Sequence, residues 1–397
     1  MSKTPLCWVP WGMMLVDTNK VLKPCCTYQG SELGRMSEDT SITDILNDTP
    51  WQELKNKLSN QEWPDGCKIC YQNELDVGHS PRIAFNNGIN NLSLKNIYNK
   101  TNKIVFIEFN GSNICNLECL HCSPHFSSKW HSTYTKKEIP LEFHKPEESK
   151  YYRSNPTLLL KNLEQLDLTQ LSQIVFKGGE PMLNSETLAI LEHLDKISIL
   201  QNIKIDIFTN GTIKNKELVN LLTKAKSCKV IISIDGIGPL NEYIRYGVDT
   251  IQEDIEHTMS EFSSFQNVIF SFSVSVMVYN IFNLVEIRDY CLECAKKYKT
   301  ELINFNLFVT HPTHLDPRVL SDDTRKKLIE YYSSKKIKNE FLHVISLLSK
   351  NYVGDILHNK WVDYTHLMEK QRGNSITELV PQLKNELRYF DNTQNNT

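Results

Sequence analysis

Three cysteines stand close together in the stretch GSNICNLECLHCSP. They are Cys115, Cys119 and Cys122. Three thiolates can hold three irons of a [4Fe–4S] cluster, and the fourth iron then lacks a protein ligand, because such clusters are usually held by four cysteines. An open position on a metal is where a substrate or cosubstrate binds. Structural cysteines or a three-thiolate zinc site are the alternative interpretation.

A second group of cysteines lies nearer the N-terminus. Cys7, Cys25 in KPCC, and Cys67 and Cys70 in GCKIC are four candidate thiolates, and Cys26 is an alternative to Cys25. CxxC pairs serve an iron–sulfur cluster and a structural zinc equally well, so the spacing alone leaves both open.

Composition limits the class of protein. The 397 residues are 40% hydrophobic, and 44 Lys and Arg against 47 Asp and Glu give a formal net charge of −3. Without a basic stripe, a nucleic-acid partner is disfavoured. The N-terminus lacks a basic region followed by a long apolar run, so we expect no signal peptide, no membrane partner and a cytoplasmic protein. In a reducing compartment, clustered cysteines indicate metal or redox chemistry rather than disulfides.

Strand-like segments must position the central cysteines. Six of them occupy residues 103–109, 173–181, 203–211, 229–236, 268–278 and 302–309. Helical patterns lie between most of these segments, and the alternation predicts an α/β fold with a parallel sheet. Six units indicate a partial (β/α)6 TIM-type barrel. Its functional loops lie at the carboxyl ends of the strands, so the loop after the first strand carries the three cysteines to the functional face.

The chain divides into three expected parts. Residues 1–95 have many turn formers, and we expect a small cluster-binding domain that buries too little apolar surface alone and is held by metal. Residues 96–310 would form the barrel, with a charged, surface-exposed insertion at about 129–155. Residues 311–397 would form a helical C-terminal extension that ends in a frayed tail.

The central motif resembles that of the radical SAM enzymes. Cys115, Cys119 and Cys122 match the CxxxCxxC motif of that superfamily in the expected place after the first strand. The resemblance implies that the open iron chelates S-adenosylmethionine (SAM), whose reductive cleavage gives a 5′-deoxyadenosyl radical that removes a hydrogen atom from the substrate. Radical chemistry of this kind belongs to the cofactor, which the protein positions and shields.

The resemblance also implies SAM contacts on successive loops. The segments GGEP, TNG and SIDG follow the second, third and fourth strands, and they would meet the amino group and the ribose of SAM. Arg245 would pair with the SAM carboxylate. The implied contacts are His121, Gly178, Gly179, Glu180, Pro181, Asn210, Ser233, Asp235 and Arg245. Each of these segments alone would be an ordinary turn, strand end or surface ion-pair former.

The N-terminal cysteines and their surroundings resemble the twitch or SPASM-type module. This resemblance implies an auxiliary iron–sulfur cluster on Cys7, Cys25, Cys67 and Cys70, placed before the barrel rather than after it. Such a cluster would move an electron to or from the active site, or close the barrel mouth.

The implied function is that of a radical SAM enzyme, acting on a peptide, protein or small-molecule substrate with a flavodoxin- or ferredoxin-type electron donor. The alternatives are a dehydrogenase or epimerase of a small carbohydrate or nucleotide, and a non-catalytic metal-cluster scaffold. No residue identifies the hydrogen-atom donor or the base. We expect the remaining Cys228, Cys291 and Cys294 in the core, and His311 and His314 beside the barrel opening or in a turn.

Overall fold

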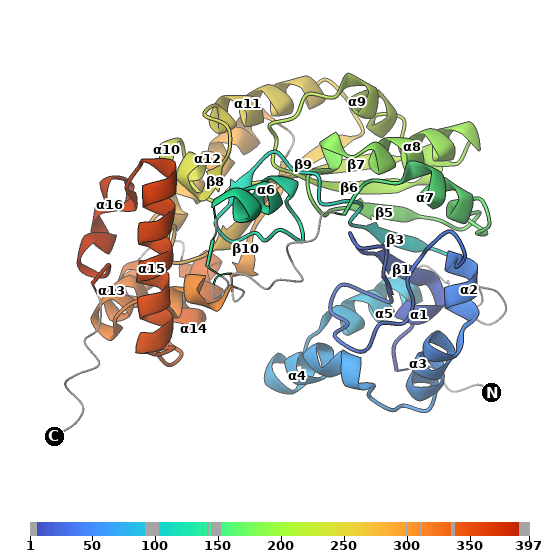
Figure 1. Cartoon of the computed structure of the whole chain (residues 1–397), viewed down its shortest axis with the longest axis horizontal. Helices are drawn as coiled ribbons and strands as arrows, with labels where there is room; N and C mark the ends of the chain where they lie inside the picture. Colours follow the sequence, from blue (N-terminus) through green and yellow to red (C-terminus); the bar gives the residue numbers. More distant parts are fainter. Residues whose placement is uncertain are drawn as a thin grey trace.

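An eight-stranded sheet forms the centre of the molecule (Figure 1). Its strands are β1 (Met13–Val16), β2 (Leu22–Lys23), β3 (Phe106–Phe109), β5 (Gln173–Phe176), β6 (Lys204–Thr209), β7 (Ser227–Ser233), β9 (Val268–Val276) and β10 (Thr300–Phe308). Their order is β10-β9-β7-β6-β5-β3-β1-β2, and only β1 and β2 pair antiparallel. This computed structural model describes residues 6–91, 103–137, 139–140, 143, 152–298, 300–309, 312–334 and 338–388.

Helices precede, connect and follow the strands. The N-terminal ones are α1 (Val9–Gly12), α2 (Ile42–Asn47), α3 (Thr49–Ser59), α4 (Lys68–Val77) and α5 (Pro81–Asn91). The central ones are α6 (Ser128–Lys137), α7 (Pro156–Leu163), α8 (Ser185–Lys196), α9 (Lys216–Leu222), α10 (Pro239–Ile244), α11 (Ile251–Phe262) and α12 (Leu284–Lys297). The C-terminal ones are α13 (Asp322–Ser334), α14 (Leu342–Leu348), α15 (Asp355–Arg372) and α16 (Ile376–Leu379).

The six expected strands are all present, and they form the parallel sheet with helical crossovers that the sequence predicts. Burial alternates along them: in β7, Cys228, Val230 and Ile232 are buried, whereas Lys229 is half-buried. Alternate residues of a strand point to opposite faces. One face of the sheet is therefore apolar and covered by helices, and the other, the inner face, carries polar side chains.

The N-terminal region packs onto the barrel sheet. β1 pairs with β3 in parallel and β2 pairs with β1, so this region extends the barrel sheet by two strands. Met14, Leu22 and Trp51 belong to the same hydrophobic core as the barrel strands. The region therefore buries its apolar side chains against the barrel. The sequence did not predict this packing, because β1 has only four residues and lies between prolines and turns.

The structure corrects the expectation for the insertion. Trp130, in α6 at the start of the supposed surface insertion, is fully buried. The helical C-terminal extension includes the 18-residue helix α15, whose buried positions include Thr365 and Trp361. Residues 144–151 of the insertion, His311 and the tail 391–397 lie outside the described residues.

The two ends of the sheet carry different sets of helices (Figure 1). The N-terminal helices lie beside β1, and α13–α16 lie at the end of the sheet that includes β10. None of the helices in the described part of the chain combines the length and the apolar character needed to cross a bilayer.

Candidate functional site

The three central cysteines lie on the segment between β3 and α6, here called the cysteine loop (residues 110–127). The short strand β4 (Glu118–Cys119) within it pairs with β8 (Arg245–Tyr246). The Cys122 amide donates to the Cys119 carbonyl (2.9 Å), and this turn brings the second and third cysteines together. None of these three thiols is in a disulfide, and each interacts electrostatically with a neighbouring cysteine or with Arg245.

The GGEP segment packs directly against this loop. The amides of Gly179 and Glu180 donate to the carbonyls of Ser112 (3.3 Å) and Ile114 (2.7 Å). Gly178 has φ +107°, and a Cβ there would lie 1.6 Å from the Asn110 carbonyl oxygen. Only glycine tolerates this approach of two backbones. The two loops therefore form one unit at the carboxyl ends of β3 and β5.

Glu180 is buried and engaged by three donors. The Met182 amide (2.9 Å) and Thr209 Oγ1 (2.8 Å) donate to its Oε1, and the Asn210 amide (2.7 Å) donates to its Oε2. Burial raises the pKa of Glu180, and these hydrogen bonds only partly offset it. The carboxylate thus ties the loop after β5 to the end of β6, and Pro181 begins a short 3₁₀ turn behind it.

Asn210 joins the end of β6 to the cysteine loop. Its Nδ2 donates to Asn116 Oδ1 (2.9 Å), and its Oδ1 accepts from the amide (2.9 Å) and the hydroxyl (2.8 Å) of Thr212. The Asn116 amide group in turn donates to Thr212 Oγ1 (2.8 Å). This closed network fixes the backbone just after Cys115.

A buried ion pair stands behind the second cysteine. Arg245 Nε lies 2.8 Å from Asp235 Oδ2, and Arg245 Nη1 lies 3.9 Å from Cys119 Sγ. The Ser275 amide donates to Asp235 Oδ1 (2.7 Å). Burial raises the pKa of the Cys119 thiol, and Arg245 opposes that rise. His121 Nδ1 is 3.8 Å from Asp235 Oδ2, and burial lowers the His121 pKa to about 4, so its ring is neutral at pH 7.

The expected ribose contacts differ in accessibility. Ser233, at the end of β7, is half-buried, whereas Asp235 is fully buried and already engaged by Arg245 and Ser275. The structure thus places Asp235 and Arg245 together beside Cys119, a pairing that the spacing did not predict.

The N-terminal cysteines also converge. Cys7, Cys25, Cys67 and Cys70 line one cavity of about 110 Å³ with an almost wholly apolar lining. Burial, with a smaller contribution from neighbouring cysteines, raises the pKa of Cys7 and of Cys67 to about 12. Cys26 also lines this cavity but is exposed, and it interacts electrostatically with Glu108 and Lys177 of the barrel.

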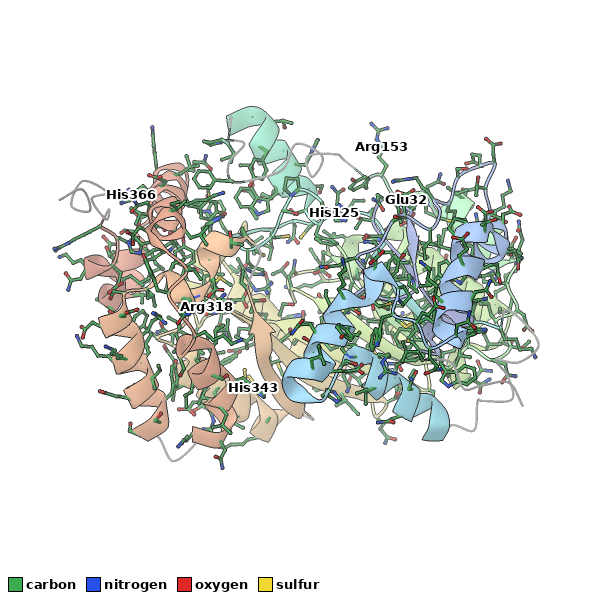
Figure 2. All side chains as sticks on the ribbon, turned by 90° about the horizontal axis from the view of Figure 1, so that it is seen from below. Glu32, His125, Arg153, Arg318, His343 and His366 are labelled. Atoms are coloured by element: carbon green, nitrogen blue, oxygen red, sulfur yellow. The ribbon has the colours of Figure 1, made fainter. Side chains whose placement is uncertain are left out.

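The β1–β2 hairpin binds the start of the cysteine loop. Lys23 Nζ (2.6 Å) and Asn110 Nδ2 (3.1 Å) donate to the two oxygens of Asp17. His125 Nε2 lies 2.9 Å from Thr18 Oγ1 and 3.5 Å from Asp17 Oδ1, and Figure 2 shows His125 near the middle of the molecule. The hairpin therefore contacts both ends of the cysteine loop.

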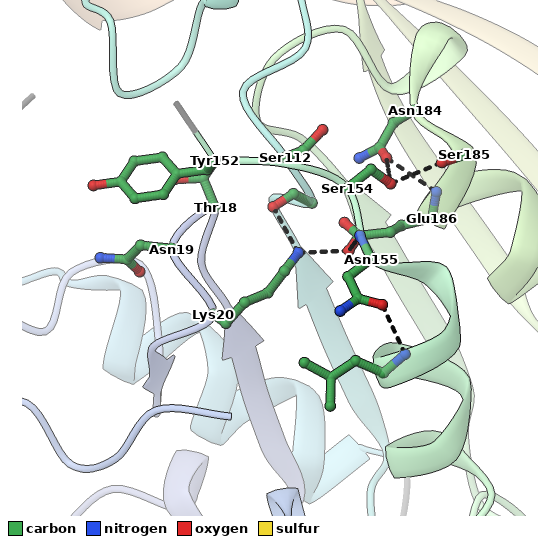
Figure 3. Close-up of polar contacts among 12 residues, drawn as sticks. Thr18, Asn19, Lys20, Ser112, Tyr152, Ser154, Asn155, Asn184, Ser185 and Glu186 are labelled. Carbon is green, nitrogen blue, oxygen red and sulfur yellow. Dashed lines mark hydrogen bonds and ion pairs between the residues drawn. The ribbon is translucent and has the colours of Figure 1, made fainter. Parts of the chain in front are cut away.

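Lys20 makes a second link from the same hairpin (Figure 3). Its Nζ donates to Glu186 Oε1 (2.6 Å) at the start of α8 and to the Gly111 carbonyl (3.4 Å). The Asn155 amide donates to the same Glu186 oxygen (2.8 Å). Glu186 is fully buried, so this ion pair is well shielded from solvent.

Two family models match the chain. The radical SAM superfamily matches residues 109–278, and the iron–sulfur cluster-binding domain SPASM matches residues 7–71. The barrel therefore carries a radical SAM domain. These domains imply a [4Fe–4S] cluster with SAM in the barrel and auxiliary iron–sulfur binding in the N-terminal region. Residues 279–397 lie outside both matches.

Solved structures resemble this radical SAM protein more distantly. Native anSMEcpe with bound AdoMet and Cp18Cys peptide is 20% identical, covers 68% of this chain and 62% of that chain, and has a TM-score of 0.36. Streptococcus suis SuiB bound to S-adenosylmethionine is 16% identical over 75% of this chain and 60% of that one, with a TM-score of 0.37. This chain spans about three-fifths of their length. No curated protein matches it.

The residues of this radical SAM protein fit the implied groups. Glu180 interacts electrostatically with Cys115, but three protein donors engage it, so it is not poised as a fourth ligand. In the described residues, no three His, Cys, Asp or Glu side chains converge on a single metal ion. The four N-terminal thiols line one apolar cavity, and a set of cysteine thiolates is the usual donor set of an iron–sulfur cluster.

Sequence reasoning missed several residues around this radical SAM site. Asn116 and Thr212 complete the Asn210 network, and Asp17 and His125 support the cysteine loop. A charge inside the apolar strand KIVFIEF, Glu108, was an available signal of a polar inner face. The other contacts join distant segments, and a single sequence carries no signal for them.

Proposed function

We propose that this protein cleaves SAM reductively and uses the resulting radical to remove a hydrogen atom from a peptide or protein side chain. The observation that carries the proposal is the packing of the cysteine loop against Gly178–Glu180 at the carboxyl ends of β3 and β5. This is the functional end of such a barrel. When bound, a [4Fe–4S] cluster with one open iron supplies the electron for SAM cleavage.

Within this proposal, Cys115, Cys119 and Cys122 hold the cluster. Arg245 offsets the negative charge of thiolate Cys119, from which its Nη1 lies 3.9 Å. Asp235 fixes the orientation of Arg245 through the 2.8 Å ion pair. The remaining donors of the Arg245 guanidinium can face the SAM carboxylate.

The SAM-binding roles follow from exposure and backbone geometry. Gly178 and Gly179 let the GGEP backbone lie against the cysteine loop, so that the segment from Gly178 to Pro181 stands beside the proposed cluster, where it would meet the SAM amino group. Glu180 and Asn210 hold this backbone in place through buried hydrogen bonds. Half-buried Ser233 offers its hydroxyl to the ribose, and neutral His121 lies beside the third cysteine, where it can flank the adenine.

In the N-terminal region we propose an auxiliary iron–sulfur cluster held by Cys7, Cys25, Cys67 and Cys70. Four protein thiolates would leave no iron open, so an electron-transfer role fits better than substrate ligation. Their apolar cavity would exclude water from the cluster. Cys26 stays outside the ligand set in this assignment, because it is exposed and faces the barrel.

The inner face of the sheet supports a polar substrate. Lys177 Nζ lies 3.0 Å from Glu108 Oε1 and 4.9 Å from the centre of the Phe208 ring. On the same face, Gln173 Nε2 donates to Asp206 Oδ2 (3.0 Å). Paired charges and side-chain amides on this face suit the polar groups of a peptide better than an apolar molecule.

The decisive experiment is anaerobic reconstitution with iron and sulfide, followed by reduction with SAM present. We expect 5′-deoxyadenosine from the wild-type protein and none from the C115A/C119A/C122A variant. A C228A variant, altered at a buried cysteine remote from both clusters, is the matched control and should retain cleavage. Absence of cleavage by the wild type with several reductants would favour the non-catalytic scaffold.

The electron-transfer role is tested separately with a C67A/C70A variant. We expect SAM cleavage to persist while oxidation of the substrate is lost. Unchanged substrate turnover in a folded variant would exclude that role. Short peptides encoded beside this chain are the first substrates to test by mass spectrometry, and turnover of a carbohydrate or nucleotide instead would favour the second candidate.

A further inference from the structure

Four consecutive carbonyls of the cysteine loop, those of residues 117–120, accept hydrogen bonds from side chains. Two of the donors are local: Ser127 Oγ donates to the carbonyl of 117 (2.7 Å), and Trp130 Nε1 donates to that of 119 (2.8 Å). A buried carbonyl needs a partner, because an unpaired buried polar group is costly. The conformation of this stretch therefore depends on side chains outside it.

The other two donors come from α15, near the C-terminus. Arg372 Nη2 donates to the Glu118 carbonyl (2.6 Å), and Tyr364 OH donates to the Leu120 carbonyl (3.0 Å). The first contact joins residues 254 positions apart in the chain. Both carbonyls flank Cys119, the middle cysteine of the motif.

Arg372 also contacts the segment that precedes β8, the strand that pairs with β4. Its Nη1 donates to the Tyr243 carbonyl (2.7 Å), so one guanidinium bridges β4 and the segment that leads into β8. The guanidinium lies 4.7 Å from the Tyr246 ring centre and 5.8 Å from that of Trp130. A planar fork stacked on aromatic rings is a geometry that lysine cannot reproduce.

The helix that carries these donors is firmly anchored. Trp361, Val362 and Met368 are fully buried, and Tyr364 is only 2% exposed. The Tyr279 and Thr365 hydroxyls also pair (2.7 Å) between the barrel and α15. An anchored helix can transmit its position to the loop, whereas a loosely attached one cannot.

We propose that α15 is a clamp on the cysteine loop, with Arg372 and Tyr364 as positioning residues for the cluster. Arg372 has a second effect, because it places a positive charge on the carbonyl that immediately precedes Cys119. The extension lies outside both family matches, which therefore assign it no role. Only the effect of the clamp on the cluster rests on the proposed function. The positioning of the cysteine loop by α15 does not depend on it.

The first measurement is hydrogen exchange of the full chain before cluster reconstitution. The reporters are the amides of Leu120 and Cys122, which donate to the carbonyls of Ile244 and Cys119. We expect R372M to speed their exchange at least about tenfold, as loss of a buried hydrogen-bonded anchor predicts, and Y364F to speed it less.

The matched control is R325M. Arg325 is also a buried arginine of the extension that donates to two backbone carbonyls, those of Leu348 and Lys350, but it does not contact the loop. We expect R325M to leave the two reporter amides as in the wild type. Equal loop exchange in R372M and the wild type would overturn the clamp.

The second measurement is the reduction potential of the reconstituted cluster. Loss of the positive charge in R372M should make the potential more negative, because that charge favours the more negative reduced state. R372K should restore the potential toward the wild-type value while loop exchange stays fast. A wild type that loads no cluster on Cys115, Cys119 and Cys122 would contradict the proposed function, and hydrogen exchange would still decide the clamp.

Discussion

At the scale of single residues, the site depends on a missing side chain, a buried carboxylate and a buried ion pair. Gly178 lets two loop backbones touch, and Glu180 satisfies three donors in a volume that excludes water. The Asp235–Arg245 pair places a positive charge behind Cys119. These residues act by positioning the backbone and by placing charge, and they do not themselves react with the substrate in the proposed function.

We expect G178A to disrupt this site. The added Cβ would meet the Asn110 carbonyl at 1.6 Å in a backbone conformation that side chains rarely adopt. Strain and overpacking should together lower the free energy of unfolding by about 2–5 kcal/mol. G78A is the control, because Gly78 also has positive φ (+68°) but its Cβ would meet nothing within 4 Å. Its cost should be about 1 kcal/mol in chemical denaturation, and similar losses in both variants would contradict the argument.

At the scale of elements, the β1–β2 hairpin supports the cysteine loop from the side of the auxiliary module. Asp17 is at the centre of this contact and is almost fully buried. Burial alone would raise its pKa, but hydrogen bonds from His125 and Lys23 outweigh burial and hold the pKa well below the usual 3.8. The hairpin therefore contributes most when Asp17 is ionised.

This contact predicts a pH dependence. A carboxyl whose pKa is lowered by folding stabilises the protein above its unfolded pKa, and that stabilisation is lost as the pH falls through 3.8 toward the native value. D17N should cost about 2 kcal/mol at pH 7, and the difference from the wild type should shrink below about pH 4. D65N, which affects only an exposed pair with Lys68 at 3.9 Å, should change stability by less than about 0.5 kcal/mol. A pH-independent D17N difference would refute this assignment.

At the scale of the whole molecule, one hydrophobic core joins the N-terminal region, the barrel and the C-terminal helices. Trp51, Ile205 and Trp361 represent the three parts, and each is fully buried. The extra strand β1 and the clamp from α15 attach both flanking regions to the barrel.

A shared core predicts that the protein folds without its clusters. We expect chelated wild type and the C67S/C70S variant to keep their helical circular dichroism and a single unfolding transition, with a cost of about 1–3 kcal/mol for the substitutions. Limited proteolysis should leave the N-terminal region intact. Selective loss of that region after chelation would instead support the metal-held domain expected from composition.

The sequence by itself determined the strands, their crossovers and the types and spacing of the cysteines. Buried and half-buried side chains alternate along residues 227–233. Such local periodicity can be recognised in the sequence without knowing which strands pair. The two cysteine groups were likewise visible as short spacings, and the family matches cover the same segments.

The tertiary structure alone decided which distant groups complete the site. It placed Arg372 on the Glu118 carbonyl, Arg245 on Asp235, and β1 beside β3. The physical reason is that periodicity and spacing record the neighbours of a residue along the chain. Hydrogen bonds and ion pairs across the core depend instead on how the whole chain closes on itself, and one sequence does not specify which of many possible partners will meet.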